Sequence, residues 1–234
     1  MLDSSRTRML IGDEAADRLS AASVAVFGVG GVGSAAAEAI ARAGVGRITL
    51  VDTDIISPSN CNRQIVALSS NIGKEKAVAM QQRILDINPG CDVTAKVEFF
   101  DEKSASGFDL SGFNAVVDAI DTVTSKLLLI ELCVKAGTYI VSSMGTGNKL
   151  RPEMLTLADI KDTKVCPLAR VMRQELRKRG VTSLPVVYSE EVPIKPAKEV
   201  LRENGKTVPG SFAPVPPAAG MILASAALRH IMEK

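Results

Sequence analysis

Apolar and polar positions along the chain follow two alternating patterns. Short apolar runs, rich in Val and Ile, alternate with longer segments in which apolar residues recur at helical spacing. The short runs predict strands at 23–27, 47–51, 92–97, 114–118 and 138–142. The longer segments predict helices at 32–43, 73–87 and 122–136. Because strands separated by helices form βαβ units, we predict an α/β fold with a Rossmann-like, mostly parallel sheet and helices on both faces.

The pattern changes after about residue 150. Strands are predicted at 153–159 and 184–188, and helices at 166–179 and 214–232. Between them, 190–213 is rich in Pro, Lys and Glu, which is typical of a loop. We expect a single domain over 1–234, with a nucleotide-binding core at about 21–150 and a smaller C-terminal extension of strands and helices at about 151–234.

Composition narrows the class of protein. The 234 residues are 46% hydrophobic and carry a net charge of +2, so a large core is available and no global basic field indicates nucleic acid. No apolar stretch reaches the roughly 18–20 residues of a membrane span, and MLDSSRTRML lacks an apolar signal core. We therefore expect a cytoplasmic protein. The four cysteines form no CxxC pair and His230 is the one histidine, which argues against zinc and against histidine-based catalysis.

Glycines follow the first predicted strand in the sequence GVGGVG at 28–33. This GxGxxG spacing lets a backbone turn approach a phosphate at the start of the next helix. Asp52 ends the second predicted strand, where a carboxylate can accept both ribose hydroxyls. NAD, FAD and ATP fit these features equally, so a nicotinamide-dependent oxidoreductase stays open at this point, as does a non-catalytic nucleotide-binding scaffold.

Charged residues near the same strand ends narrow the ligand. Arg63 and Lys76 follow Asp52, and two cations there suit a triphosphate better than a pyrophosphate that the glycine turn already binds. Asp118 and Asp121 end another strand at the same rim. Two carboxylates beside a polyphosphate indicate Mg²⁺, which takes one or two carboxylates together with phosphate oxygens. We therefore expect ATP and Mg²⁺ rather than a hydride-transfer cofactor.

Five motifs in the core resemble the ubiquitin-activating-enzyme-like ATP-binding family, whose members adenylate a carboxylate. They are GVGGVGS at 28–34, DTD at 52–54, SNCNRQ at 59–64, GKEK at 73–76 and DAID at 118–121. The resemblance implies that Asp52 holds the ribose and that Asp121 serves Mg²⁺ and catalysis. It also implies phosphate contacts from Ser59, Asn60, Arg63 and Lys76. The full candidate set for nucleotide binding is Gly28, Gly30, Gly31, Gly33, Asp52, Asp54, Ser59, Asn60, Asn62, Arg63, Gln64, Lys76 and Asp121.

Homodimers of this family carry an arginine near the N-terminus that reaches into the partner's site. Arg8 in RTRML at 6–10 is the candidate here, and Arg6 competes with it. The resemblance therefore implies a homodimer, and it makes Arg8, Arg63, Lys76 and Asp121 the candidate catalytic residues.

Two branches of the family compete for the identity of the carboxylate. One branch adenylates the C-terminal glycine of a ubiquitin-like sulfur carrier, and its members typically hold zinc with two CxxC pairs that this chain lacks. The other dehydrates threonylcarbamoyladenosine beside the anticodon of tRNA, through adenylation of the threonine carboxylate and closure to a cyclic product. The resemblance to this branch is longer. It includes RMLIGDEAADRL at 8–19, ARAGVGRITLVD at 41–52, INPGCDV at 87–93, CPLARVMRQELRKRG at 166–180 and VPPAAGMILASAALRHIM at 215–232.

The predicted helix at 166–179 is the candidate tRNA contact. Arg170, Arg173 and Arg177 recur at i, i+3 and i+7, which places them together on one side, where they can meet RNA phosphates. A solvated helix face is the alternative. Cys166 starts this helix, and both a plain thiol and a catalytic or persulfide role are open for it. The family resemblance also leaves open a sulfur-transfer protein partner.

Overall fold

The computed structural model describes residues 2–198, 200–201 and 207–233. Its centre is a seven-stranded sheet in the order β3-β2-β1-β4-β5-β7-β6. All neighbouring strands run parallel except β6, which is antiparallel to β7. The strands are β1 (Ser23–Phe27), β2 (Arg47–Val51), β3 (Asp92–Lys96), β4 (Ala115–Asp118), β5 (Ile140–Ser143), β6 (Leu155–Asp159) and β7 (Pro185–Ser189). The mostly parallel sheet confirms the predicted fold class.

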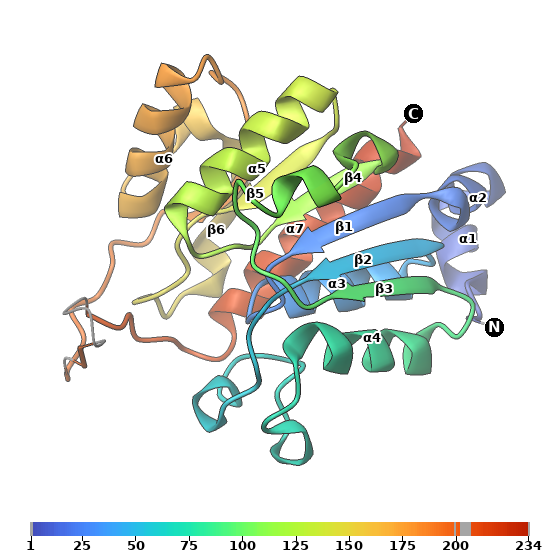
Figure 1. The fold of residues 1–234 in the computed structure, drawn as a ribbon, viewed down its shortest axis with the longest axis horizontal. Helices are drawn as coiled ribbons and strands as arrows, with labels where there is room; N and C mark the ends of the chain where they lie inside the picture. Colours follow the sequence, from blue (N-terminus) through green and yellow to red (C-terminus); the bar gives the residue numbers. More distant parts are fainter. Residues whose placement is uncertain (1, 199, 202–206, 234) are drawn as a thin grey trace.

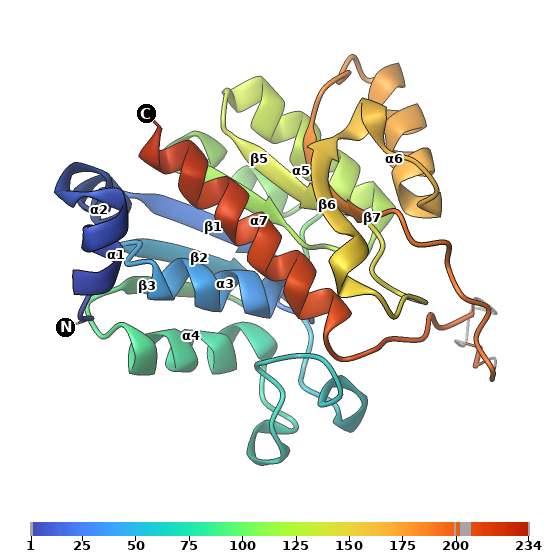
Figure 2. The same ribbon diagram turned by 180° about the vertical axis from the view of Figure 1, so that it is seen from behind.

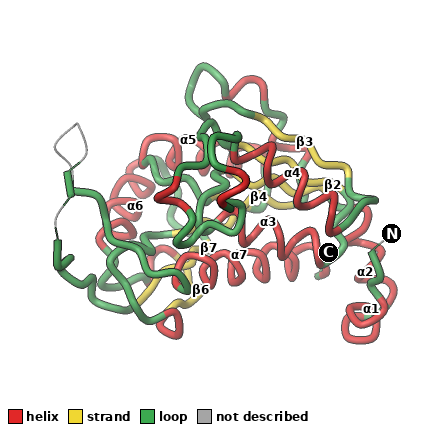
Figure 3. Tube along the Cα trace, turned by 90° about the horizontal axis from the view of Figure 1, so that it is seen from below, coloured by secondary structure: helices red, strands yellow, loops and turns green. Residues whose placement is uncertain are grey.

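Helices cover both faces of the sheet (Figures 1 and 2). One face carries α3 (Gly33–Arg42), α4 (Lys76–Ile87) and the long C-terminal α7 (Val215–Met232). The other face carries α5 (Val123–Ala136) and α6 (Pro167–Lys178). Figure 3 shows α5 and α6 on one side of the strands and α3 and α7 on the other. Because β6 and β7 extend the same sheet, the C-terminal extension packs as a continuation of the core rather than as a separate layer.

Strand alternation builds the two halves of the core. In β1, Val24 and Val26 pack in the cluster beneath α3, α4 and α7, while Ala25 and Phe27 pack in the cluster beneath α5 and α6. All four side chains are fully buried. A strand buried on both faces needs continuous apolar sequence, and SVAVF at 23–27 meets that need.

The chain differs from the sequence prediction mainly at its N-terminus and at element boundaries. Two helices that we did not predict, α1 (Ser5–Ile11) and α2 (Asp13–Ala21), precede β1. The helix predicted from residue 73 begins at Lys76, because Glu75 first forms an isolated bridge with Ile55. The segment predicted as a loop at 190–213 contains no helix among its described residues, in agreement with the prediction.

Candidate active site

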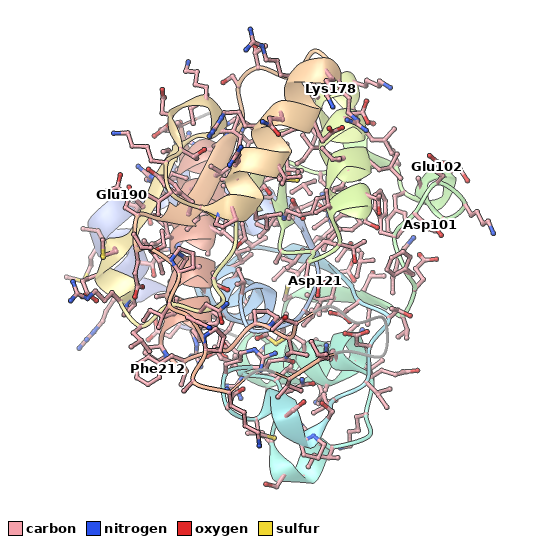
Figure 4. All side chains as sticks on the ribbon, turned by 90° about the vertical axis from the view of Figure 1, so that its left-hand side faces the viewer. Asp101, Glu102, Asp121, Lys178, Glu190 and Phe212 are labelled. Carbon is pink, nitrogen blue, oxygen red and sulfur yellow. The ribbon has the colours of Figure 1, made fainter. Side chains whose placement is uncertain are left out.

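One large cleft opens at the carboxyl edge of the parallel strands, where sequence reasoning placed the ligand. It lies where β1 and β4 are neighbours, the point at which the chain switches from building the sheet on one side to building it on the other. Its volume is about 540 Å³, within the usual range for a small-molecule site. Figure 4 views the molecule toward this edge, with Asp121 near the centre of the picture. The turns that follow β1, β2, β4 and β5 all contribute to its lining.

The glycine turn after β1 lines the cleft through Gly28, Gly30 and Gly31. Gly28 has a φ of +85°, and a Cβ atom there would lie 2.6 Å from the carbonyl oxygen of Ala119, so this position requires glycine. Gly33, predicted as a nucleotide contact, does not line the cleft. A Cβ at Gly33 would lie 1.7 Å from the carbonyl oxygen of Gly28, so its role is close packing of α3 against the turn.

Asp52 stands at the end of β2 with both carboxylate oxygens already oriented by the backbone. Its Oδ2 accepts a hydrogen bond from the Val29 amide at 2.6 Å, and its Oδ1 accepts one from the Asp54 amide at 2.8 Å. Burial raises the pKa of Asp52, although these two hydrogen bonds and the charge of Lys76 oppose the shift. Each oxygen retains a lone pair that can accept a ligand hydroxyl, and the contact of Asp52 with ribose stays a prediction.

Lys76 is held against Asp54 at the start of α4. Its Nζ lies 2.6 Å from Asp54 Oδ2, and the lysine side chain is 7% exposed while the aspartate side chain is 64% exposed. Both residues line the cleft. The ion pair therefore presents a nearly buried ammonium group at a fixed place in the site, and Asp54 orients Lys76 in addition to lining the cleft.

Arg63 is oriented by two residues predicted to contact the nucleotide directly. Its Nη1 donates to the Ser59 carbonyl at 3.1 Å and to Asn62 Oδ1 at 2.7 Å. Arg63, Asn60 and Gln64 line the cleft, whereas Ser59 and Asn62 do not. Ser59 and Asn62 therefore orient the guanidinium group, and their direct contact with the nucleotide stays a prediction. Since Nη1 makes both bonds, the rest of the guanidinium fork stays available to an anion.

Asp121 and Asp118 have different environments, although the sequence placed both at the rim. Asp121 is exposed, lines the cleft and interacts with the Thr122 hydroxyl at 3.4 Å. Asp118 is fully buried, with its Oδ2 2.8 Å from Lys126 Nζ and accepting a bond from the Ser142 hydroxyl at 2.6 Å. The expectation that both carboxylates face a metal is wrong, because β4 lies in the middle of the sheet and buries the side chain at its end.

Sequence reasoning missed the second half of the cleft. This half is lined by the segment after β5, 143–147, by the C-terminal segment 208–211, and by Leu168 at the start of α6. Glu98, Phe99 and Phe100 after β3 also line the cleft on the nucleotide side. The sequence SMGTG at 143–147 directly follows a predicted strand, so its glycines were a usable signal. The segment 208–211 carried no comparable signal, since only tertiary packing brings it to the site.

Four predicted residues lie away from this chain's own cleft. Arg8 pairs with Asp13 and Asp17, and its helix α1 lies beside the amino-terminal ends of the strands (Figure 1). On α6, Arg170 and Arg177 are exposed. Arg173 is half-buried and donates to the carbonyl and hydroxyl oxygens of Thr163, at 2.9 and 2.6 Å.

The cysteines and acidic residues build no metal centre in the described part of the chain. No group of three or more His, Cys, Asp or Glu residues there is arranged to hold a metal ion. Cys61 is exposed, and the other three cysteines are buried. Burial raises the pKa of Cys91 to about 11 and that of Cys133 to about 12, which makes both thiols unreactive near neutral pH. None of the described helices is long and apolar enough to cross a membrane.

Comparison with known proteins matches residues 4–234 to the ThiF family. The chain is 43% identical over 229 residues to tRNA threonylcarbamoyladenosine dehydratase of Bacillus subtilis, covering 94% of this chain and 90% of that protein. Its structure resembles that of the E. coli tRNA N6-threonylcarbamoyladenosine dehydratase TcdA in complex with ATP, with a TM-score of 0.89 and 34% identity over 98% of this chain and 93% of that one. The yeast adenylyltransferase and sulfurtransferase UBA4 matches at 33% identity, over 61% of this chain and 32% of its own length. The chain belongs to the ThiF family.

Proposed function

We propose that this protein uses ATP to dehydrate threonylcarbamoyladenosine in tRNA to a cyclic product. The observation that carries the proposal is the division of the cleft into two unlike halves. One half gathers the ribose and phosphate ligands Asp52, Arg63 and Lys76, and the other half contains no ionisable side chain among its described lining residues. A charged nucleotide beside an uncharged acceptor pocket suits transfer of a nucleotidyl group to a small organic carboxylate. The identity of the substrate is inferred from the relatives that are named as dehydratases of this nucleoside.

The reaction proceeds in two steps, adenylation and ring closure. An oxygen of the threonine carboxylate attacks the α-phosphorus of ATP, the bond from that phosphorus to the bridging oxygen breaks, and pyrophosphate leaves. The carbamoyl oxygen of the same substituent then attacks the activated carbonyl carbon. AMP departs with the electron pair of the broken C–O bond, and the carbamoyl nitrogen loses a proton. Well-oriented intramolecular attack reaches effective molarities of about 10⁵–10⁸ M, so the enzyme needs no nucleophile of its own.

The residues of the nucleotide half then have defined tasks. Asp52 accepts the ribose hydroxyls, and the glycine turn lets phosphate approach the start of α3. Arg63 and Lys76 stabilise the charge that develops on the phosphates as pyrophosphate leaves. Since Ser59 and Asn62 fix the guanidinium and Asp54 fixes the ammonium, both cations are positioned before the nucleotide arrives. Such preorganisation is the main source of electrostatic catalysis in phosphoryl-group chemistry.

Asp121 fits a Mg²⁺ ion bound together with the nucleotide. Its carboxylate is exposed in the cleft and accepts one long contact, from Thr122, so it is available as a ligand. Mg²⁺ commonly takes one or two protein carboxylates and completes its shell with phosphate oxygens and water. Asp118 is not available, because Lys126 and Ser142 occupy its Oδ2. When bound, the ion would neutralise phosphate charge.

Arg8 has a place in the proposal only if the protein is a homodimer. Its helix α1 lies beside the opposite end of the strands from the cleft (Figure 1), so it reaches a cleft only in a second copy. Met9 and Leu10 on the same helix are 87% and 86% exposed, as expected of side chains covered in a dimer. Mixing inactive Arg8→Ala and Asp121→Ala chains tests this directly. Random reassortment should restore about one quarter of wild-type activity, from heterodimers with one intact site. No recovery would remove Arg8 from the site.

The exposed arginines of α6 are the proposed contact with tRNA. Leu168, in the first turn of α6, lines the cleft, so the helix that carries the basic side chains begins at the cleft. Arg170 and Arg177 are free to meet phosphates, whereas Arg173 is committed to Thr163. Each of Arg170→Ala and Arg177→Ala should weaken tRNA binding and reduce its dependence on salt, with a slope lower by about one unit. Equal salt slopes in wild type and both variants would discard this surface.

The alternative, adenylation of a ubiquitin-like carrier protein, finds less support. A catalytic or persulfide role of Cys166 would favour that branch, and Cys166 is only 3% exposed at the start of α6. Cys61 is the exposed thiol that a sulfur-transfer partner would meet. Dehydration of tRNA, by contrast, needs no cysteine and would take place in the cytoplasm, where the tRNA is.

The test is incubation of the purified protein with ATP, Mg²⁺ and tRNA that carries threonylcarbamoyladenosine, followed by mass spectrometry of the digested nucleosides. We expect that nucleoside to lose one water only when ATP is present. An unchanged nucleoside would transfer support to the carrier-protein alternative.

A further inference from the structure

The uncharged half of the cleft has a definite chemical character. Its lining consists of two segments, 143–147 after β5 and 208–211 before α7, together with Leu168 and Pro216. The hydroxyl-bearing lining residues are Ser143, whose hydroxyl donates to the Met144 carbonyl at 3.1 Å, Thr146 and Ser211, and every ionisable lining residue lies in the other half. The Ser211 hydroxyl is buried and meets no hydrogen-bond partner among the residues that the structure describes. A buried hydroxyl without a partner is costly unless a ligand satisfies it.

Asn148 holds the two segments together. Its backbone amide donates to the Gly210 carbonyl at 2.8 Å, and its Oδ1 accepts from the Gly210 amide at 2.6 Å. Its own carbonyl accepts from the Ile194 amide at 2.8 Å, so one residue makes three hydrogen bonds to the C-terminal loop. Asn148 has a φ of +58°, a left-handed conformation that asparagine tolerates better than most residues.

Two further contacts set the position of the 208–211 wall. A Cβ on Gly147 would lie 2.8 Å from the Cβ of Pro209, so the two segments approach as closely as glycine allows. On the nucleotide side, the Asn62 side-chain amide donates to the Ser211 carbonyl at 3.3 Å. Because Asn62 also accepts from Arg63, the wall is linked to the guanidinium that faces the phosphates.

We propose that segments 143–147 and 208–211 bind the threonylcarbamoyl substituent of the modified adenosine, and that Asn148 is a positioning residue that holds the outer wall of this pocket. The proposal rests on the proposed function. Apart from its carboxylate, the substituent is neutral and carries hydroxyl, amide and carbonyl groups. Hydroxyls and exposed backbone groups match it, while its carboxylate points toward Arg63 and the nucleotide.

Binding can be tested without turnover. Hydrogen–deuterium exchange is measured with an ATP analogue whose α,β-bridging oxygen is replaced by a methylene group, so that pyrophosphate cannot leave, in the presence of either the free threonylcarbamoyladenosine nucleoside or plain adenosine. We expect the modified nucleoside, but not plain adenosine, to slow amide exchange in both 143–147 and 208–211. Equal exchange with the two nucleosides would overturn the pocket even if tRNA is dehydrated. Protection of both segments without any dehydration of tRNA would instead refute the proposed function and leave the pocket standing.

Two variants at one position test the positioning role. Asn148→Gly keeps the left-handed backbone and the amide but loses the Oδ1 acceptor, whereas Asn148→Asp keeps an acceptor oxygen. For tRNA, kcat/KM should fall about fivefold in Asn148→Gly, corresponding to one lost hydrogen bond, and should stay near wild type in Asn148→Asp. The Kd for ATP should be unchanged in both, which a general loss of structure would not give. An unchanged kcat/KM in Asn148→Gly would overturn the positioning role of Asn148. So would an increase in the Kd for ATP by the same factor as the loss in kcat/KM.

Discussion

The buried ion pair beneath the cleft allows a sharp prediction of stability. Lys126 Nζ and Asp118 Oδ2 lie 2.8 Å apart, and both side chains are 0% exposed. Asp118 also accepts bonds from the Ser142 hydroxyl at 2.6 Å and from the Ile120 amide at 3.1 Å. Replacing Lys126 with Met preserves much of the side-chain volume but leaves a carboxylate buried without its counter-charge.

The expected loss in the free energy of unfolding for Lys126→Met is about 3–5 kcal/mol, the usual effect of removing one partner of a buried pair. This is a large share of the roughly 5–15 kcal/mol that stabilises a typical domain. Urea unfolding followed by circular dichroism measures the change, and the midpoint should fall while the slope stays constant. The loss should also loosen the turn that carries Asp121, because the Ile120 amide is bonded to the same carboxylate.

A second variant controls for packing. When Asp118→Asn is combined with Lys126→Met, both charges are absent and the introduced side-chain amide can still accept through its oxygen, so most of the stability should return. If Lys126→Met does not fold, the double variant still should. The reasoning is refuted if the single variant loses less than about 1 kcal/mol, or if the double variant is as unstable as the single one.

Three further predictions concern the thiols, the acidic limit of stability and catalysis. A thiol reagent at mildly alkaline pH should label one cysteine of the folded protein, and Cys61→Ser should abolish the labelling, because the other thiols are buried. Burial raises the pKa of Glu38, but hydrogen bonds and charge from Arg83 and Arg42 outweigh it and leave the pKa lowered. Because its pKa is lowered, ionised Glu38 stabilises the folded state above its unfolded-state pKa of about 4.3, and this stability is lost as pH falls through its folded-state pKa. The free energies of unfolding of wild type and Glu38→Gln, measured by urea titration, should therefore converge in acid. Arg63→Ala should lower kcat/KM by about 10²–10³ with an unchanged circular dichroism spectrum, and full activity would remove Arg63 from the site.

Local signals in the sequence were sufficient to predict the fold and to place Asp52 and Lys76 at the cleft. The apolar runs that predict β1, β2 and β4 are largely buried on both faces, so their pattern is continuous and easy to identify. Asp52 directly follows β2 and Lys76 begins α4, so their place at the carboxyl edge follows from the parallel topology, whereas Arg63 lies in the loop between these two elements. That the chain forms one domain stays a prediction.

Features that depend on tertiary packing were not predictable in the same way. The sequence placed Asp118 and Asp121 alike at the rim, yet the central position of β4 and the length of the Lys126 side chain bury the first of them. Ser59 and Asn62 orient Arg63 rather than line the cleft, which depends on side-chain geometry within the short helix at Pro58–Asn60 and the turn after it. The wall at 208–211 reaches the cleft through Asn148, far away in sequence.

The central claim is that a carboxylate of the modified nucleoside attacks the α-phosphorus of ATP. The most direct test uses tRNA whose threonylcarbamoyl carboxylate carries a heavy oxygen isotope, in a single turnover with ATP and Mg²⁺, with mass spectrometry of the released nucleotides and phosphates. The account predicts that the heavy oxygen appears in AMP. Heavy oxygen in inorganic phosphate, with ADP as the nucleotide product, would contradict it, because the attack would then have occurred at the terminal phosphate.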